Sequence, residues 1–536
     1  MKTGRVVENA ERAASRGVLA TTMPTKILLS LALLMISLCG VHRAQQVDTA
    51  GLRFEVRVAR SAPPSIQAGR LLVVISRKSD PEPRLTIGAT GLDAPVVMGR
   101  DLAEREAGAA AVIDSGSIIF PLARLGDLPV GDYHVQALYD TNRDVRSPNA
   151  PGNLYSDVRQ VHLDSSRGGA IKLELVHRIP PEQLPAESEF IKYIKIQSRL
   201  LSDFHGRPIH LRAGVILPRS FSDDAARRFP LRVHIGGYGA SYREAAEMME
   251  PGAAFRRAWE EPGAPQMILL HLDGDGPFGD SYQINSDVNG PYGDAVTQEL
   301  IPHVERKFRA LGRAEARVVD GGSTGGWVSL ALQIFYPEYF NGAWASCPDS
   351  VDFRAFQLLN IYADTNAYVN ARGFERPSAR ETNGDVRFTM RHECQMENVM
   401  GAGDSWTMSG EQWGAWNAVY GPRGADGRPV PLWHPRTGAI NRDVAERWRR
   451  YDLRNVLERD WPTLAPKLRG KLRISIGEAD NYFLNNAVRM LDDFLGRASP
   501  SYAGRIQYGP GQGHCWSPLT ERQVMDEMEK AVSGER

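Results

Sequence analysis

The period of the hydrophobic positions changes once along the chain. From about residue 51 to 178, apolar residues alternate with polar ones, as Phe54, Val56 and Val58 do with their charged neighbours. A period of two residues predicts strands with one buried face. Further short apolar runs lie at 71–75, 118–120, 133–139 and 171–175. Because Gly, Pro and Asp separate these runs and helical spacing is nearly absent, the region predicts a β-sandwich.

A proline-rich stretch, 179–190, predicts a linker, and the pattern after it is different. Apolar strand-like runs alternate there with segments of helical spacing, which favours a mostly parallel sheet with helices on both faces. The predicted strands are 192–201, 209–217, 231–235, 267–272, 317–320, 343–345, 472–476 and 505–508. The predicted helices are 294–309, 327–335 and 484–495. Residues 191–536 are therefore expected to form an α/β domain.

The first 44 residues predict a signal peptide with an N-terminal extension. Lys26 precedes the apolar run Ile27–Cys39, which is shorter than the roughly 20 residues of a spanning helix. We expect cleavage near Ala44 and an exported protein, periplasmic or extracellular. An uncleaved membrane anchor is the alternative that the sequence leaves open.

Charge and residue spacing exclude several classes of function. Lys plus Arg and Asp plus Glu both number 64, so no net charge attracts nucleic acid or an anionic membrane. No Cys and His spacing matches a zinc site, and Asp273-Gly274-Asp275-Gly276 lacks the other ligands of a calcium loop. We expect no metal and no cofactor. The sequence does not indicate an oligomeric state.

The sequence Gly321-Gly322-Ser323-Thr324-Gly325-Gly326 lies between a predicted strand and a predicted helix. A Gly-x-Ser-x-Gly at such a turn is typical of a nucleophile elbow, in which small neighbours let the strand and helix approach closely. Ser323 is therefore the candidate nucleophile. A glycine-rich loop with an incidental serine is the alternative.

A serine nucleophile needs a histidine base and an acid that orients it. His514 follows the last predicted strand and is the candidate base. The turn after strand 472–476 carries Asp480, the candidate acid, with Glu478 as its competitor. Thr324 follows the nucleophile and is one candidate oxyanion donor, and the Gly-rich turn after strand 231–235 supplies Tyr238, then Gly237, as the other.

Residues 210–516 resemble the esterase D and feruloyl-esterase-like branch of the α/β-hydrolases. The resemblance rests on the following motifs: Val215-Ile216-Leu217-Pro218, His234-Ile235-Gly236-Gly237-Tyr238-Gly239, Gly290-Pro291-Tyr292-Gly293-Asp294-Ala295, Glu299-Leu300-Ile301-Pro302, Gly321–Gly326 and Gly513-His514. It implies an α/β-hydrolase fold and carboxylic-ester hydrolysis. The oxyanion turn departs from the branch by reading His-Ile-Gly-Gly, and the N-terminal β region, expected to be immunoglobulin-like and to fold by itself, lies outside the resemblance.

A long insert at about 350–470 separates two strands of the predicted sheet. It is rich in tryptophan and methionine, so it predicts either a lid over the site or a small subdomain with its own core. As a lid, it would bring Trp406, Trp413 and Trp416 to the substrate. Cys394 in the insert is the candidate partner of Cys347, which would leave Cys515 free, and the sequence leaves this pairing open.

Together these features predict a serine hydrolase that cleaves a small-molecule or carbohydrate-linked carboxylic ester through an acyl-enzyme. A serine peptidase of prolyl-oligopeptidase-like type is one alternative, although the N-terminal region is too short for a full propeller. A binding protein with a degenerate hydrolase domain is the other.

Overall fold

The computed structural model describes residues 51–534 except 60–64 and 107. From Gly51 onward the chain forms one compact unit. The predicted signal segment, residues 1–44, lies outside the described residues. In the part of the chain that is described, no helix is long and apolar enough to cross a membrane.

The N-terminal region is built from strands, as its alternating pattern predicts. They are β1 (Leu52–Val58), β2 (Ser65–Ile66), β3 (Gly69–Ser76), β4 (Val96–Leu102), β5 (Arg105–Glu106), β6 (Ala110–Ile113), β7 (Ile118–Phe120), β8 (Gly131–Asp140), β9 (Leu154–Ser156), β10 (Arg159–Leu163) and β11 (Gly169–Arg178). Most pair into one sheet in the order β6-β1-β11-β9-β8-β3-β4-β7, with β10 paired to β8, while β2 and β5 form a separate ribbon. The predicted sandwich of two sheets is not confirmed, because a continuous hydrogen-bonded path joins these strands around one core.

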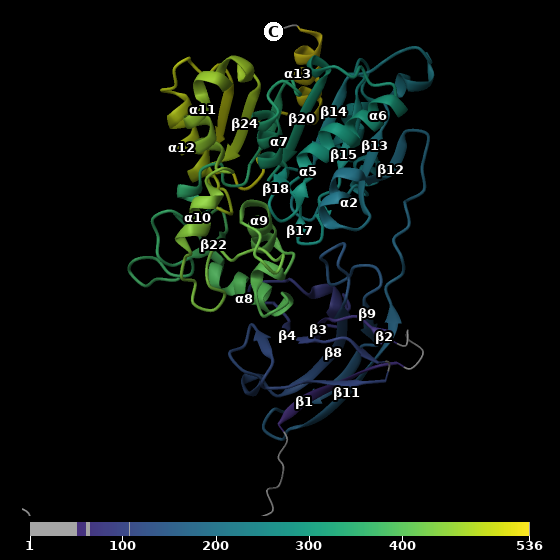
Figure 1. Ribbon diagram of the computed structural model, residues 1–536, viewed down its shortest axis with the longest axis vertical. Helices are drawn as coiled ribbons and strands as arrows, with labels where there is room; N and C mark the ends of the chain where they lie inside the picture. Colours follow the sequence, from purple (N-terminus) through teal and green to yellow (C-terminus); the bar gives the residue numbers. More distant parts are fainter. Residues whose placement is uncertain (1–50, 60–64, 107, 535–536) are drawn as a thin grey trace, which may run out of the picture. The chain divides into compact units, whose positions relative to one another are not determined.

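Strand β3 is buried on both faces, which explains its continuous apolar run. Leu71, Val73 and Ile75 point into the core that β1, β8 and β11 share. Leu72 and Val74 belong to a second cluster with Met396, Val399 and Met400 of α8 (Met390–Met400), a helix of the long insert. The N-terminal sheet therefore has two apolar faces, and the insert covers one of them (Figure 1). This shared cluster argues against the independent folding expected from the sequence.

The second large sheet contains the strands predicted after the linker. Its order is β12 (Ile191–Ser198), β13 (Ile209–Ile216), β15 (Ile268–Leu272), β14 (Leu231–Ile235), β20 (Arg317–Gly322), β21 (Ala343–Ser346), β24 (Leu472–Gly477) and β25 (Arg505–Gly509). The first two strand pairs are antiparallel and all later pairs are parallel. The carboxyl ends of the parallel strands consequently lie along one edge, where open α/β sheets bind ligands.

Helices cover both faces of this sheet (Figure 1). The described α-helices besides α8 are α2 (Arg199–His205), α3 (Glu244–Met248), α4 (Ala254–Glu260), α5 (Tyr292–Ala295), α6 (Ile301–Lys307), α7 (Thr324–Phe335), α9 (Gln412–Tyr420), α10 (Arg442–Trp448), α11 (Leu453–Leu468), α12 (Asn485–Leu495) and α13 (Glu521–Ser533). Two adjacent residues of β20 pack against helices on opposite faces of the sheet. Val319 packs in the large core with α7, whereas Val318 packs against Met528 of α13.

Two predicted elements differ locally from the structure. The strand expected at 192–201 ends at Ser198, because the Ser198 side chain accepts a hydrogen bond from the Leu201 N–H and begins α2. The helix expected at 294–309 consists of α5 and α6 joined by a π-helical turn at Val296–Leu300. Short ribbons outside the two sheets are β16 (Asp275–Gly276) with β17 (Gly279–Asp280), β18 (Asn285–Ser286) with β19 (Gly290–Pro291), and β22 (Pro377–Arg380) with β23 (Val386–Thr389).

The insert lies between β21 and β24 and shares the core of the second large sheet. Its tryptophans at 406, 413, 416, 433, 448 and 461 are all buried in the same apolar cluster as Val233 of β14 and Val319 of β20. The insert is therefore neither a separately cored subdomain nor a loose cover over an existing surface. It extends the main core.

A buried ion pair joins two central strands of the second large sheet. Arg232 of β14 donates two hydrogen bonds to the Asp320 carboxylate of β20, at 2.9 and 2.7 Å. Burial alone would raise the pKa of Asp320, but the charges of Arg232 and His234 outweigh burial and hold that pKa well below its usual value. The pair therefore stabilises the fold above about pH 4, the ordinary range of the acid, and this contribution disappears as pH falls through the lowered pKa.

We predict that Arg232→Met destabilises the protein at pH 7 by about 3–5 kcal/mol, because it removes the arginine from a buried carboxylate. Urea unfolding followed by circular dichroism measures this loss. The double variant Arg232→Met/Asp320→Asn is the control and should recover a large part of the stability. Equal losses in the single and double variants would contradict the prediction.

Candidate active site

Ser323 lies at the turn between β20 and α7 with a strained backbone. Its φ of 56° and ψ of −121° fall in a region that residues other than glycine rarely adopt. A Cβ on Gly325 would lie 2.0 Å from the Ile235 carbonyl oxygen, so only glycine lets α7 begin this close to β14. This geometry is that of a nucleophile elbow.

His514 and Asp480 are hydrogen-bonded in series to this serine. His514 Nε2 lies 3.0 Å from Ser323 Oγ, and His514 Nδ1 lies 2.8 Å from Asp480 Oδ2. These partners assign the ring proton to Nδ1 and leave Nε2 as the acceptor of the serine proton. The three residues follow β20, β24 and β25, whose ends lie along the carboxyl edge of the sheet, with β21 between β20 and β24.

The environment of Asp480 distinguishes it from Glu478. Asp480 is fully buried, and its Oδ1 accepts hydrogen bonds from the Tyr482 and Leu484 N–H groups at 2.9 and 3.2 Å. Its carboxylate is thus fixed by backbone donors on one oxygen and by His514 on the other. Glu478 instead accepts a hydrogen bond from Arg489. The structure brings Asp480 to the histidine and leaves Glu478 away from it.

The candidate oxyanion donors surround the serine. Thr324 is the first residue of α7, so its N–H has no acceptor within the helix. Gly237 and Tyr238 line the same cavity as Ser323, and a Cβ on Gly237 would lie 4.0 Å from the Ser323 Cβ. The Tyr238 hydroxyl donates to the Gly410 carbonyl oxygen at 2.7 Å, which ties the oxyanion turn to the insert.

A buried carboxylate that sequence reasoning missed, Asp349, organises this turn. It accepts hydrogen bonds from Tyr282 Oη at 2.6 Å, Thr324 Oγ1 at 3.2 Å and Trp416 Nε1 at 3.1 Å. Its backbone N–H also donates to the Ser323 carbonyl oxygen at 3.2 Å. Burial raises the pKa of Asp349. Its position just after β21, at the same sheet edge as the serine, was the signal available in the sequence.

The disulfide expected between Cys347 and Cys394 is wrong. Cys347 pairs with Cys515, with a Cα–Cα distance of 4.7 Å, and Cys394 is a free, buried thiol inside α8. The reason is topological, since Cys347 follows β21 and Cys515 follows His514, so both lie at the catalytic edge. The ligand atoms of Cys347, His514 and Cys515 lie within 4.8 Å of one another, but the sulfurs are joined to each other rather than present as thiolates.

The three tryptophans predicted to contact substrate have different positions. Trp416 lines the cavity that contains Ser323, whereas Trp406 and Trp413 do not. Trp406 is fully buried against Trp433, with ring centroids 4.5 Å apart, and Trp413 donates from Nε1 to Glu393 at 2.8 Å. Only one of the three is therefore placed to touch a substrate.

The cavity above Ser323 has a volume of about 560 Å³ and is rich in carboxyl groups. Glu393, Glu397 and Glu411 line it together with Asp349. Burial raises the pKa values of Glu393 and Glu397, and it raises the pKa of Glu411 to about 7. Near neutral pH these groups are consequently less charged than their number suggests, and the cation Arg387 lines the same cavity.

Comparisons with known proteins agree with this geometry. Residues 211–447 match the family model described as "Putative esterase", a segment that includes Ser323 and ends before Asp480 and His514. No curated protein sequence matches the chain.

Solved structures similar to this chain include an esterase and two hydrolases. A ferulic acid esterase is 13% identical, with 64% of this chain and 96% of that chain covered and a TM-score of 0.37. A fluorophosphonate-binding serine hydrolase of Staphylococcus aureus is 13% identical, with 64% and 97% covered and a TM-score of 0.36. An S-formylglutathione hydrolase from Agrobacterium tumefaciens is 12% identical, with 65% and 97% covered and a TM-score of 0.35.

We predict that removing the disulfide impairs turnover as well as stability. Cys515 directly follows His514 and closes a span of 168 residues, so the double variant Cys347→Ala/Cys515→Ala should lose roughly 2–5 kcal/mol of stability. Freed from this anchor, the His514 loop should also hold its hydrogen bond to Ser323 less often, which lowers kcat of the folded variant. Cys394→Ala is the matched control and should keep its kcat. Unchanged kcat in the double variant would show that the histidine needs no such anchor.

A matched pair of tryptophan variants tests the role of Asp349. Trp416→Phe removes one donor from this buried carboxylate and should lower kcat/KM for esters, by the roughly 1–3 kcal/mol that a lost buried hydrogen bond costs. Trp406→Phe should leave kcat/KM unchanged, since the Trp406 Nε1 has no partner among the described residues. Steady-state kinetics on one small ester compares the two. Equal effects would contradict a specific role for the Trp416 to Asp349 hydrogen bond.

Proposed function

We propose that the protein is an exported serine hydrolase that cleaves carboxylic esters through an acyl-enzyme intermediate. The observation that carries this proposal is the continuous hydrogen-bonded series Ser323, His514 and Asp480 at a strained elbow that opens into a cavity. Nucleophile and base are within hydrogen-bond distance, and a third group orients the base, which is the arrangement that activates a serine hydroxyl.

The first half of the reaction forms the acyl-enzyme. Ser323 Oγ attacks the ester carbonyl carbon while its proton moves to His514 Nε2. The buried Asp480 carboxylate stabilises the imidazolium that results. The carbonyl oxygen becomes an oxyanion, which the N–H groups of Thr324 and of Tyr238 or Gly237 stabilise. His514 then returns the proton to the leaving alcohol as the bond between carbon and alcohol oxygen breaks.

The second half regenerates the serine. Water attacks the acyl carbon and gives its proton to His514 Nε2, and the same donors stabilise the second oxyanion. When this intermediate collapses, the proton passes from His514 back to Ser323 Oγ and the carboxylic acid leaves. Each proton that the histidine takes up is returned, so the reaction consumes only the ester and water.

Two features support export. The apolar run Ile27–Cys39 has the length of a signal sequence. The Cys347–Cys515 disulfide at the catalytic edge is typical of proteins that function in oxidising compartments. We infer a periplasmic or extracellular location, and a substrate that is a small-molecule or carbohydrate-linked ester.

We predict that Ser323→Ala and His514→Ala each lower kcat for a small acetate ester by roughly 10⁴-fold or more. The double variant should lose little beyond either single variant, because the two residues act as one unit. Steady-state kinetics on aryl acetate, with thermal unfolding of each variant, measures both quantities. Multiplicative losses would argue against a shared proton transfer.

A labelling experiment separates the esterase from its alternatives. A fluorophosphonate probe should label the wild type and the matched control Ser517→Ala, and it should not label Ser323→Ala. Turnover of a peptide substrate at a higher kcat/KM than any ester would favour a peptidase. Absence of both labelling and turnover would favour a binding protein with an inactive hydrolase domain.

A further inference from the structure

The N-terminal β region reaches the cavity that contains the candidate nucleophile. The loop between a 3₁₀ turn at Pro83–Thr86 and β4 contributes Gly88 and Thr90 to the lining of this cavity, together with Ser323 and His514. Gly88 has a φ of +96°, and a Cβ at this position would lie 3.4 Å from Glu411 Oε1. Residues far apart in the sequence thus form adjacent walls of one site.

Contacts with α8 hold this loop in place. The Gly91 N–H donates to His392 Nε2 at 3.0 Å. Burial lowers the pKa of His392, which favours the neutral ring that this hydrogen bond requires. The same imidazole packs edge-on against Phe120 of β7, with centroids 4.7 Å apart. The loop is consequently anchored to the insert on the side next to the cavity.

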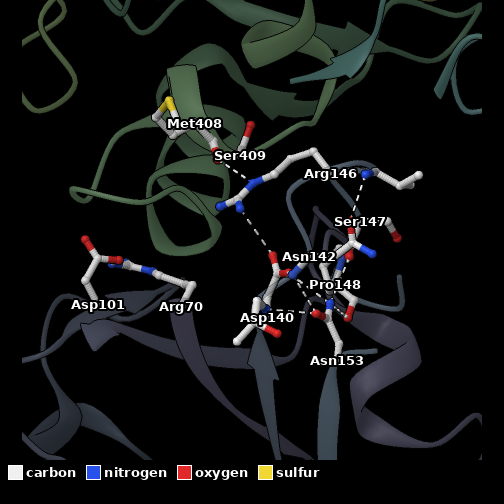
Figure 2. Close-up of polar contacts among 12 residues, drawn as sticks. Arg70, Asp101, Asp140, Asn142, Arg146, Ser147, Pro148, Asn153, Met408 and Ser409 are labelled. Carbon is white, nitrogen blue, oxygen red and sulfur yellow. Dashed lines mark hydrogen bonds and ion pairs between the residues drawn. The ribbon is translucent and has the colours of Figure 1, made fainter. Parts of the chain in front are cut away.

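Two arginines of the β region fix its position relative to the insert. Arg70 is only 1% exposed, donates to the Val399 carbonyl oxygen at 2.9 Å, and forms ion pairs of 2.9 Å with Asp101 and Asp404. Arg146 donates from Nε to the Met408 carbonyl oxygen at 2.9 Å and pairs with Asp140 at 3.5 Å (Figure 2). The buried guanidinium groups of the β region thus donate to backbone carbonyl oxygens of the insert. Such contacts allow little movement of the β region against the insert, because a small displacement would leave a buried charge without its partner.

The second arginine also contacts the segment that holds the oxyanion turn. Gly410, two residues after Met408, packs so closely on Arg146 that a Cβ there would lie 2.3 Å from the Arg146 Cγ. The Gly410 carbonyl oxygen in turn accepts the hydrogen bond from the Tyr238 hydroxyl. The β region therefore contacts the edge of the sheet that carries Ser323 at two points. Thr90 lines the cavity there, and Arg146 packs on Gly410, which binds Tyr238.

We propose that the N-terminal β region is a substrate-binding element, in which Gly88 and Thr90 beside Glu411 bind a hydroxyl group on the part of the ester beyond the scissile bond. This inference rests on the proposed ester hydrolysis. The wall offers backbone, hydroxyl and carboxyl groups, which form hydrogen bonds with a neutral hydroxyl.

Variants of one loop in the full-length protein test this assignment. Thr90→Val removes the hydroxyl at nearly constant volume, and Thr90→Trp fills part of the cavity. Leu92→Trp is the matched control, because Leu92 is on the same loop, is fully exposed and does not line the cavity. The substrates are ethyl acetate, propyl butyrate and glycerol 1-butyrate, of which the last two differ chiefly by hydroxyl groups.

The wild type should prefer glycerol 1-butyrate over propyl butyrate in kcat/KM, and Thr90→Val should reduce this preference about 3- to 10-fold. Thr90→Trp should raise KM for both butyrates by about tenfold or more and should lower kcat/KM for ethyl acetate by a smaller factor than for either butyrate. Leu92→Trp should leave all three within about twofold of the wild type. Thermal unfolding of each variant identifies any that fails to fold. If Thr90→Trp fails to fold, the result for Thr90→Val alone tests the inference.

Three results would overturn the inference: no wild-type preference for the glycerol ester, an unchanged preference in Thr90→Val, or equal losses on all three esters in a folded Thr90→Trp variant. The last would mean that the loop only supports the fold. Failure of the underlying function is distinguishable, since the wild type would then hydrolyse none of the esters and Ser323 would not react with a fluorophosphonate. In that case the inference falls together with the proposed function.

Discussion

The backbone conformation of Ser323 is the constraint on which the rest of the site depends. A non-glycine residue keeps such φ and ψ values only when its surroundings impose them. Here the ends of β21 and β14 do so. The Ser323 N–H donates to the Ser346 carbonyl oxygen of β21 at 3.0 Å, its own carbonyl accepts from Asp349, and Gly325 lets α7 approach Ile235 of β14. The hydroxyl is consequently held at the sheet edge, where His514 reaches it.

Elements from the whole chain converge on this edge. The insert supplies the Gly410 carbonyl that binds Tyr238, the Cys347–Cys515 disulfide joins the loop after β21 to the loop of His514, and the N-terminal β region contributes Thr90. Because the insert packs its tryptophans into the main core, it is a rigid wall rather than a movable cover. The insert, the loops joined by the disulfide and the N-terminal β region together determine the size and polarity of the cavity. Ser323 lies within it as the candidate nucleophile.

Local pattern was enough to predict the elements and the order of the site residues. Strand β14 occurs at the predicted residues, and the turn at Ser323 follows from a strand, a helix and glycines between them. Contacts between residues far apart in the sequence could not be predicted from the spacing of apolar residues. Cys515 pairs with Cys347 because two loops meet at one edge, and the burial of Trp406 depends on Trp433. The expected sandwich is not confirmed, and no periodicity within β3 reveals that α8 covers Leu72 and Val74.

The most direct test of the account is to trap the covalent intermediate. The enzyme is mixed with excess p-nitrophenyl acetate, quenched with acid during the first turnover, and analysed by peptide mass spectrometry. The account predicts a burst of nitrophenol close to the enzyme concentration and an acetyl group on the peptide that contains Ser323. Turnover of the ester without any acetylated Ser323, under conditions in which the burst is complete, would contradict it.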